Sequence, residues 1–367
     1  MGDTRLMRLK IADHILALEP YVPGKPIEEL EREYGIANAV KLASNENPLG
    51  PSPKAVKAIR QALKTVHRYP NGSGYDLLKR ISQKLNVPVE SIVLGNGSDD
   101  IISMLAQVLL QPGAEAVLPK PSFLMYELTV SSSGATPIGI GLNANTIDLD
   151  RMLESITSKT RLVFLNNPHN PTGTLISKDR IEAFIAALPS DIVLVIDEAY
   201  IEFVRERHCP NSIDYVNSDK VIVGLRTFSK AYGLAGLRIG YGVMPAPLAD
   251  LLNRVRQPFN VNSLAQAAAI AAIDDEEFLE DTVRLVHDEL EFMYAALDEL
   301  EIDYIKSQAN FFMINVRRDA NQVFDDLLKQ GIIVRSMTSY GYPDCIRVNV
   351  GRHDENVRFL KALKTVL

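Results

Sequence analysis

The sequence predicts an α/β protein with a large, doubly wound, mainly parallel sheet and a smaller α+β domain. Between residues 92 and 225, short apolar runs alternate with amphipathic stretches, which is the pattern of parallel strands joined by helical crossovers. After residue 276 the pattern changes to one long charged helix, followed by short strands around a second helix. The length of 367 residues, with 46% hydrophobic and 23% charged, suits one large and one small globular domain.

The strands of the large sheet are expected where aliphatic residues run without interruption between polar segments. Helices are expected at 100–110 and 178–187, where apolar residues recur with helical spacing. Sheets of this kind bind ligands beyond the carboxyl ends of their strands, so the residues after each run are the first candidates for a site. The expected strands are 92–94, 116–118, 162–166, 192–197 and 221–225.

The smaller domain is expected in the last part of the chain. Residues 276–300 form a long charged amphipathic pattern typical of a helix, and 321–329 form a second helical pattern. The short apolar runs 311–316, 332–335 and 345–350 are typical of strands. We therefore expect a mixed α+β unit here.

The start of the chain is expected to join this smaller domain. Regular structure is interrupted there by Pro20, Pro23 and Pro26. The resulting division is an N-terminal segment at 1–42, a large domain at 43–256 and a small C-terminal domain at 257–367.

Composition limits the possible partners. The net charge of −7 comes without a basic tail or a Lys/Arg cluster, which argues against nucleic acid and anionic membranes. Cys209 and Cys345 lie far apart, without a CxxC motif or a His-rich neighbour, so we expect no disulfide framework and no metal site. No segment approaches the roughly 20 apolar residues that a membrane span needs. We therefore expect a cytoplasmic protein.

One lysine, Lys230, stands among hydroxyl residues and glycines shortly after the strand at 221–225. A lysine amine can form a Schiff base with an aldehyde, and the nearby Ser229 and Arg238 suit phosphate oxygens. Pyridoxal phosphate carries both of these groups. Taken alone, however, a Ser-Lys pair is usually a solvated lysine at a turn, so other segments must decide.

A carboxylate and a phenol follow the next strand of interest. Asp197, at the end of 192–197, can pair with a protonated pyridine nitrogen and keep the ring an electron sink. Tyr200 can donate to the phenolic oxygen of the same ring. The alternative is that Asp197 is a helix N-cap, a position that aspartate favours, and this segment alone does not decide between the two.

The loop after 162–166 contains two X-Pro steps and Gly173, which hold the Asn170 amide in one orientation. That amide can donate to a ring oxygen of a cofactor. The alternative is a plain turn, and His169 fits a loop residue better than a catalytic base.

The turn at 95–99 joins a strand to the helix expected near Asp100. Two glycines before a helix N-terminus offer free N–H groups and a positive dipole end to a phosphate, although a glycine-rich turn alone is weak grounds. Phe123, after the strand at 116–118, can stack on a planar ring, whereas a buried aromatic side chain is more often part of a core.

Together these segments resemble the fold-type I pyridoxal-phosphate aminotransferases, and among them most closely the histidinol-phosphate aminotransferases. The resemblance covers nearly the whole length, and the ordered set of motifs is far more specific than any single member. The motifs are ASNENP at 43–48, RYP at 68–70, the glycine turn at 95–99, NPTG at 170–173, DEAY at 197–200, SK at 229–230, SQANF at 307–311 and IRV at 346–348.

This resemblance implies a fold-type I transferase with pyridoxal 5′-phosphate as its cofactor. Lys230 would be the Schiff-base lysine and proton shuttle, and Asp197 would pair with the pyridine nitrogen. Tyr200 and Asn170 would bind the ring oxygen, and Phe123 would take the stacking position, often a tyrosine in relatives. The residues implied for the phosphate are Gly97, Ser98, Asp99, Thr227, Ser229 and Arg238.

The resemblance also implies an assembly and a reaction. Tyr69 would reach the cofactor phosphate of the neighbouring subunit, which requires a homodimer with shared active sites. The implied reaction belongs to histidine biosynthesis: L-histidinol phosphate and 2-oxoglutarate give imidazole-acetol phosphate and L-glutamate. Ping-pong kinetics are expected, since one site serves both half-reactions.

The substrate anions require arginines. Histidinol phosphate carries a CH2-phosphate where glutamate carries its carboxylate, so one arginine, matched here by Arg347, should serve both. Arg335 matches a second arginine for the substrate phosphate, with a surface ion pair as the alternative. Tyr21 and Asn45, together with Asn170, match the residues that line the substrate.

Three other functions stay open. An aromatic amino-acid aminotransferase shares nearly every cofactor residue, and Phe123 in place of tyrosine slightly favours it. A pyridoxal-phosphate lyase, such as a threonine-phosphate decarboxylase, also needs arginines for a substrate phosphate. A non-catalytic regulator usually carries an additional DNA-binding module, for which we expect no N-terminal room in this sequence.

Overall fold

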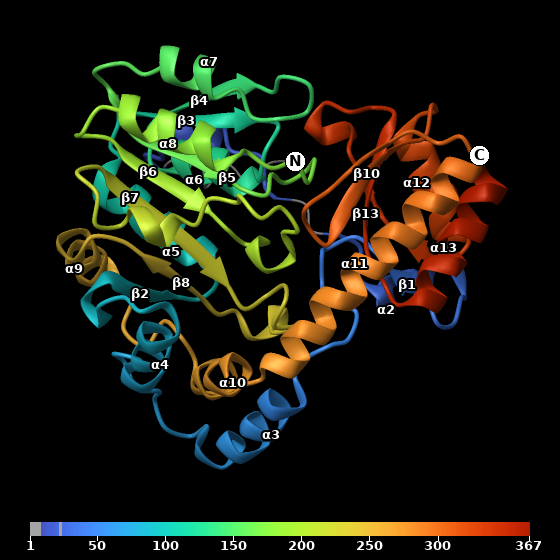
Figure 1. The fold of residues 1–367 in the computed structure, drawn as a ribbon, viewed down its shortest axis with the longest axis horizontal. Helices are drawn as coiled ribbons and strands as arrows, with labels where there is room; N and C mark the ends of the chain where they lie inside the picture. Colours follow the sequence, from blue (N-terminus) through green and yellow to red (C-terminus); the bar gives the residue numbers. More distant parts are fainter. Residues whose placement is uncertain (1–8, 22–23) are drawn as a thin grey trace.

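The structure of the protein, a computed structural model, describes residues 9–21 and 24–367. Two units stand side by side in Figure 1, a large sheet with helices on both faces and a smaller sheet with its own helices. Across the described part of the chain, no helix has the length and apolar character needed to span a membrane.

The large sheet has seven strands in the order β2-β8-β7-β6-β5-β3-β4. All of its neighbouring pairs are parallel except those made by β8, which is antiparallel to both β2 and β7. The carboxyl ends of the other six strands therefore share one edge. The bounds are β2 Ile92–Gly95, β3 Glu115–Lys120, β4 Thr136–Gly141, β5 Thr160–Asn166, β6 Val193–Asp197, β7 Val221–Thr227 and β8 Gly240–Val243.

Helices cover both faces of this sheet because successive strand residues alternate between them. In β5, Leu162 and Phe164 pack with the first set of helices, whereas Val163 and Leu165 pack with the second. The first set is α5 Ser98–Leu109, α6 Leu124–Ser132 and α9 Ala246–Val255, and the second is α7 Leu149–Glu154 and α8 Lys178–Ala187. A further group packs near the β2 edge: α3 Pro53–Ala62, α4 Tyr75–Leu85 and α10 Ser263–Ile273.

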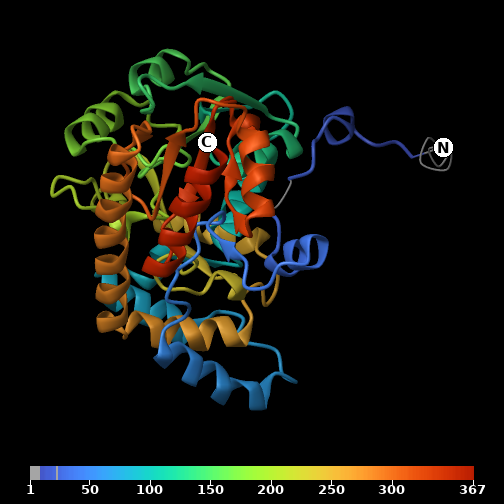
Figure 2. The ribbon, with the colours of Figure 1, turned by 90° about the vertical axis from the view of Figure 1, so that its right-hand side faces the viewer.

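The smaller unit is an antiparallel four-stranded sheet in the order β12-β13-β10-β9, packed against helices α11, α12 and α13. In Figures 1 and 2, α11 runs from the end of α10 along one side of this unit. The bounds are α11 Glu276–Glu299, β9 Tyr304–Ile305, β10 Phe311–Asn315, α12 Ala320–Lys329, β12 Arg335–Ser336, β13 Cys345–Asn349 and α13 His353–Val366.

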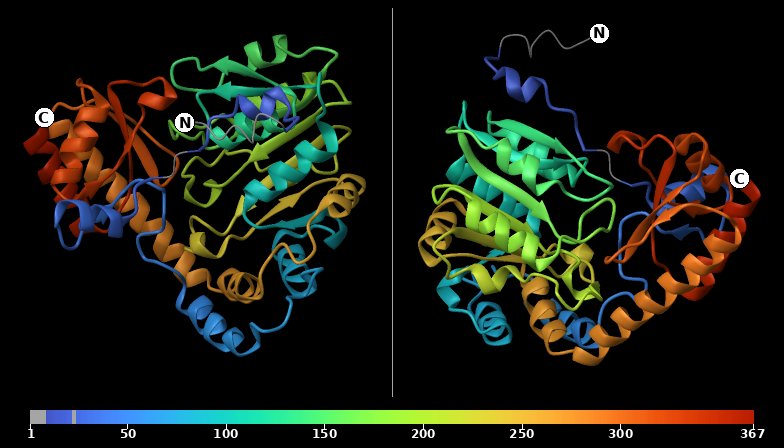
Figure 3. Two further views of the ribbon diagram at one scale, coloured as in Figure 1. Left: turned by 180° about the vertical axis from the view of Figure 1, so that it is seen from behind. Right: turned by 45° about the horizontal axis from the view of Figure 1, so that its top comes forward.

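The N-terminal segment contacts both units. Helix α1 (Asp13–Leu16) lies near α6, in front of the large sheet in the left view of Figure 3. Helix α2 (Ile27–Tyr34) begins after Pro26, and β1 (Val40–Lys41) then pairs in parallel with β11 (Ile332–Ile333) of the smaller unit. Pro23 and residues 1–8 lie outside the described residues. Short 3-10 helices lie at Leu63–Thr65, Val89–Ser91, Ile201–Phe203, Ser212–Tyr215, Ala235–Leu237 and Thr338–Tyr340.

The predicted α/β class, with a mainly parallel large sheet, is confirmed. The prediction of a single strand at 332–335 is wrong, because these residues belong to two strands, β11 and β12. β11 pairs with β1, whereas β12 pairs with β13 in the smaller sheet, and the chain changes partner at Val334. An apolar run looks the same in the sequence whether it stays in one sheet or passes between two.

The division at 42/43 and 256/257 stays a prediction. Helix α10 shares a buried cluster with β2 and β8, because Ala265 and Ala268 pack with Leu94 and Val243. We therefore propose that the large domain extends through α10, and that the small domain begins near α11.

Candidate active site

A cavity of about 470 Å³ lies where the strand ends of the large sheet face the smaller unit. Both units contribute to its wall, as does the segment that precedes α3. Nearly all residues predicted for the site line it: Tyr21, Asn45, Ser98, Asp99, Phe123, Asn170, Asp197, Tyr200, Thr227, Ser229, Lys230, Arg238, Arg335 and Arg347. Gly97 and Tyr69 are the two predicted residues that do not.

Lys230 follows β7, and its side chain points into this cavity. Its Nζ donates a hydrogen bond of 3.0 Å to the Ser44 carbonyl oxygen and lies 5.8 Å from the centre of the Tyr200 ring. Burial, reinforced by the positive charge of Arg347, lowers the pKa of Lys230 to about 8. The amine is therefore far more often neutral, and so nucleophilic, than a lysine in water.

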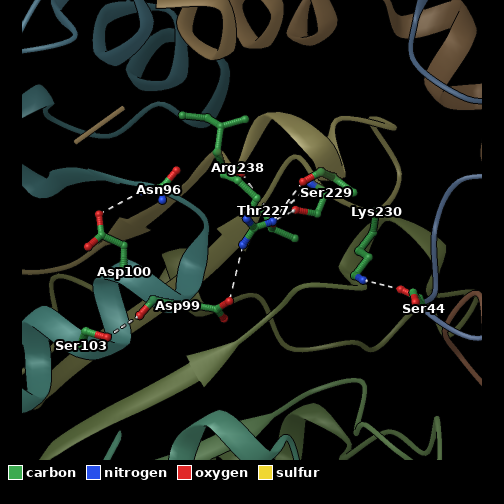
Figure 4. Close-up of polar contacts among 11 residues, drawn as sticks. Ser44, Asn96, Asp99, Asp100, Ser103, Thr227, Ser229, Lys230 and Arg238 are labelled. Atoms are coloured by element: carbon green, nitrogen blue, oxygen red, sulfur yellow. Dashed lines mark hydrogen bonds and ion pairs between the residues drawn. The ribbon is translucent and has the colours of Figure 1, made fainter. Parts of the chain in front are cut away.

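Donor groups that suit an anion form a cradle beside Lys230 at the start of α5 (Figure 4). Gly97, at φ +85°, is the N-cap of α5 and provides no side chain to cap the first N–H groups. A Cβ atom on Gly97 would lie 2.4 Å from Nη2 of Arg238, so a side chain here would displace the guanidinium from its present position. Ser229 and Thr227 add hydroxyl groups, with Ser229 Oγ 3.5 Å from Arg238 Nη1.

One carboxylate accompanies the cradle. Asp99 Oδ2 lies 3.5 Å from Arg238 Nη2, and burial raises the pKa of Asp99 while Arg238 opposes that effect. The arrangement therefore supplies uncapped N–H groups, two hydroxyls and one guanidinium, which is the donor set that a phosphate prefers.

Asp197 ends β6 at the other side of the cavity. Its Oδ1 accepts from the Ala199 N–H at 3.1 Å, and its Oδ2 accepts from the Tyr126 hydroxyl at 2.7 Å. Burial raises the pKa of Asp197 to about 6, against the effect of these two hydrogen bonds. The N-cap interpretation of Asp197 is wrong, because the next 3-10 helix starts at Ile201 and has Tyr200 as its N-cap.

Two asparagines surround the Tyr200 hydroxyl. Asn45 Nδ2 lies 2.9 Å and Asn170 Nδ2 3.5 Å from that oxygen. Burial raises the pKa of Tyr200 to about 12, so the phenol keeps its proton near neutral pH and can donate it. The Oδ1 atom of Asn45 is buried and has no hydrogen-bond partner among the described residues, which leaves an acceptor at the cavity wall.

Arg347 extends from β13 toward the same group. Its Nη1 donates to Asn170 Oδ1 at 2.6 Å and its Nη2 to the Ala43 carbonyl at 3.0 Å. Its Nε is buried and finds no partner within the described ranges. Arg335, on the adjacent strand, lies 6.0 Å from the centre of the Tyr21 ring. Two guanidinium groups therefore line one end of the cavity.

Several contributing residues were not predicted. Tyr126 lies in the first turn of α6, three positions after Phe123, which is the N-cap residue of that helix, and this short spacing could have brought both to the site. Tyr340 lines the cavity beside Arg335, and Ser44 acts through its carbonyl group. No side-chain pattern in the sequence marks a backbone acceptor such as Ser44.

Tyr69, a predicted site residue, and His169, expected to be a loop residue, both lie outside the cavity lining. Tyr69 is 82% exposed and stacks on Phe259 at 4.7 Å, so its predicted role at a neighbouring subunit stays a prediction. His169 is buried between Thr172 and the Pro121 carbonyl, and burial lowers its pKa to about 3. A histidine that stays neutral in this way holds the loop in place.

The residues present fit pyridoxal 5′-phosphate. They provide a lysine amine of lowered pKa for an aldehyde, a phosphate cradle, a buried carboxylate for a pyridine nitrogen, and a phenol with asparagine amides for a ring oxygen. In the described residues, no group of His, Cys, Asp and Glu side chains could hold a metal ion.

Comparisons with known proteins agree with this chemistry. A family model described as aminotransferase class I and II matches residues 37–363. The chain is 48% identical to histidinol-phosphate aminotransferase 1 of Nitrosococcus oceani over 367 residues, which cover 100% of this chain and 99% of the relative. It is also 48% identical to histidinol-phosphate aminotransferase 2 of Carboxydothermus hydrogenoformans, covering 95% of this chain and 97% of the relative.

Solved structures show the same architecture. The histidinol-phosphate aminotransferase of Sinorhizobium meliloti, solved in complex with pyridoxal-5′-phosphate, superimposes with a TM-score of 0.90 at 28% identity and 98% coverage of both chains. An aspartate aminotransferase double mutant of Thermus thermophilus, at 21% identity, has the same fold with a TM-score of 0.84, covering 98% of this chain and 100% of that one.

Proposed function

The chain belongs to the class I and II aminotransferase family, and we propose that it transfers the amino group of L-histidinol phosphate to 2-oxoglutarate. Its cofactor is pyridoxal 5′-phosphate, and its products are imidazole-acetol phosphate and L-glutamate. The observation that carries the choice of substrate is the pair Arg335 and Arg347 at one end of the cavity. Two guanidinium groups suit a phosphate dianion better than an uncharged side chain.

Each part of the cofactor has a candidate partner in the cavity. When bound, pyridoxal phosphate supplies an electron-accepting ring that stabilises negative charge on the substrate carbon that loses its proton. The N-terminus of α5, with Ser229 and Arg238, would hold the phosphate, and Asp197 would hold the pyridine nitrogen. Phe123 would cover the ring face. These assignments are supported by the shared cavity and by the donor set at each position.

Lys230 is the residue that would move the proton at the substrate Cα. Its pKa of about 8 lets the amine accept and return a proton near neutral pH. The Ser44 carbonyl, 3.0 Å from Nζ, gives the free lysine a resting position at the cavity wall. Tyr200 would donate to the ring oxygen, with its hydroxyl oriented by the amides of Asn45 and Asn170.

The smaller unit would bind the anionic end of each substrate. Arg347 would hold the carboxylate of glutamate or the phosphate of histidinol phosphate, and Arg335 would add a second contact to the phosphate only. Both substrates use one site in turn, which accounts for ping-pong kinetics. Tyr21 and Asn45 would complete the substrate wall.

We further propose that the protein works as a cytoplasmic homodimer with shared active sites. Tyr69 supports this dimer, because its aromatic side chain is 82% exposed in the monomer and would bury apolar surface only against a partner. Leu63 and Val66, six and three positions earlier in the chain, are also exposed apolar side chains, at 51% and 55%. A second copy would cover this surface and receive Tyr69 at its own phosphate cradle.

The choice of substrate is tested by supplying histidinol phosphate, phenylalanine and threonine phosphate separately, each with 2-oxoglutarate. Glutamate formation should be fastest with histidinol phosphate and absent in Lys230→Ala. A decisive preference for phenylalanine would assign the chain to aromatic amino acids instead. Loss of carbon dioxide from threonine phosphate without glutamate would indicate a lyase.

A further inference from the structure

Tyr126, a buried residue at the cavity wall, connects two parts of the site. It is 0% exposed, and its hydroxyl donates a 2.7 Å hydrogen bond to Oδ2 of Asp197. Its ring stacks on Phe164 at 4.8 Å and meets the edge of Phe123 at 5.5 Å. One rigid side chain therefore contacts both the carboxylate proposed for the pyridine nitrogen and the aromatic ring proposed to cover the cofactor.

The two hydrogen bonds to Asp197 determine how its carboxylate lies. Oδ1 accepts from the Ala199 N–H in the turn after β6 and Oδ2 from the Tyr126 hydroxyl on α6, so each oxygen has its own donor. Among the described residues, Tyr126 provides the side-chain donor to this carboxylate. Since a hydroxyl that donates to an ionised carboxylate favours the charged form, the contact affects charge as well as orientation.

Several groups around Asp197 oppose its ionisation, and the Tyr126 hydroxyl acts against them. Asp99, from α5, and Glu198, its neighbour in the chain, both oppose its ionisation. Tyr200 lies close and stays neutral, while the cations Lys230, Arg238 and Arg347 line the same cavity. Burial is the largest effect and raises the pKa of Asp197 to about 6. Without the Tyr126 hydroxyl, one of the two contacts that oppose this rise would be lost.

We propose that Tyr126 is a positioning residue that keeps the Asp197 carboxylate oriented and ionised for the ring nitrogen of the cofactor. This inference rests on the proposed function, because it assumes that Asp197 meets that nitrogen. Tyr126 acts on the ring nitrogen through Asp197, and its edge contact with Phe123 also holds the stacking ring beside the same carboxylate.

The test measures binding of pyridoxamine 5′-phosphate to the cofactor-free protein as a function of pH. The ring nitrogen of this probe is protonated at neutral pH, so its affinity should fall as acid neutralises Asp197. In Tyr126→Phe the midpoint of that fall should move up by about one to two pH units, because a hydrogen bond to a charged group is lost. Tyr126→3-fluorotyrosine is a stronger donor and should move the midpoint down.

Two controls separate this role from a structural one. The analogue with carbon in place of the ring nitrogen should lack the fall assigned to Asp197, while the titration of its phosphate is unchanged. Tyr294→Phe removes another buried hydroxyl, one that accepts from the Ser307 N–H in the smaller unit, and should leave the midpoint where it was. Circular dichroism checks the fold of each variant, and 3-fluorotyrosine decides the question if Tyr126→Phe does not fold.

The possible outcomes are distinct. Equal midpoints in the wild type and in the folded variants, or equal weakening of both probes, would overturn the role of Tyr126. A different result would overturn the proposed function itself: the wild-type protein with pyridoxal phosphate would show no visible absorbance band, or would show a band that persists in Lys230→Ala. The predicted opposite shifts of the two substitutions at residue 126, seen only with the nitrogen-containing probe, would support the proposal.

Discussion

Arg335 and Arg347 are direct partners across neighbouring antiparallel strands of the smaller sheet. Like charges at such positions repel each other, and Arg335 adds to the effect of burial that lowers the pKa of Arg347. Asn170 and the Ala43 carbonyl compensate Arg347 in part. A dianion that reached both guanidinium groups would remove the repulsion, so this pair favours a phosphate.

The first prediction separates the two arginines by substrate. In Arg335→Ala, the KM for histidinol phosphate should rise by about tenfold or more, since one charge-assisted hydrogen bond is worth about 1.5–3 kcal/mol. The KM for glutamate should change much less, because a carboxylate needs only Arg347. Steady-state kinetics of both half-reactions measure this, with the exposed Arg317→Ala as a matched control. Equal effects on the two substrates would count against a phosphate role.

The second prediction concerns Arg347 itself. Arg347→Lys keeps the charge but loses the planar fork that reaches Asn170 and Ala43 together. We expect the KM of each substrate to rise by about tenfold or more, and by a similar factor for the two substrates. The visible spectrum of the bound cofactor should stay unchanged. A loss confined to one substrate would mean that Arg347 does not bind the anion that both have in common.

The third prediction is a pH dependence set by Lys230. With a pKa of about 8 instead of 10.5, the neutral amine at pH 7 is about 300 times more abundant than for a lysine in water. The rate at which pyridoxal phosphate bonds to the cofactor-free protein should therefore rise about tenfold per pH unit and level off near pH 8. Stopped-flow absorbance measures this rate, and Lys230→Ala should give no band. A rate still rising at pH 10 would contradict the lowered pKa.

The sequence predicts those site residues that directly follow the strands of the large sheet. Lys230, Asp197 and Asn170 come together because parallel strands end at one edge, and apolar runs reveal where strands end. The helix expected near Asp100 begins at Ser98, which brings the first turn to the cradle. These are local features that motifs and periodicity can detect.

Other parts of the site depend on contacts between distant segments. Tyr126 meets Asp197 across 71 positions of sequence, and only the packing of α6 on the sheet brings them together. Asn45 adopts φ +55° and is held by Asn349 and Asn310, contacts that no spacing rule suggests. The split of 332–335 into two strands depends likewise on which strand each half meets.

The fourth prediction concerns stability. Arg226 Nε lies 2.7 Å from Glu198 Oε2, with side chains only 11% and 1% exposed, and Ser212 donates twice to the same carboxylate. Arg226→Met leaves that carboxylate buried without its counter-ion and should cost about 3–5 kcal/mol of unfolding free energy. Urea unfolding of the holoenzyme measures this. The double variant with Glu198→Gln should recover part of the loss, and additive losses would show that the two side chains are not coupled.

The last prediction tests the shared site through Tyr69. Tyr69→Ala should bind pyridoxal phosphate about tenfold more weakly, because one hydrogen bond to the phosphate would be lost. Lys230→Ala should be inactive at any cofactor concentration.

If Tyr69 serves the neighbouring subunit, a mixed dimer of these two variants contains one site with both residues intact. Refolding an equal mixture at limiting cofactor should then restore activity to about a quarter of the sites. A mixture no more active than its parts would mean that Tyr69 does not reach a neighbour. Tyr75→Ala, which removes another exposed aromatic side chain, is the matched control and should retain full cofactor affinity.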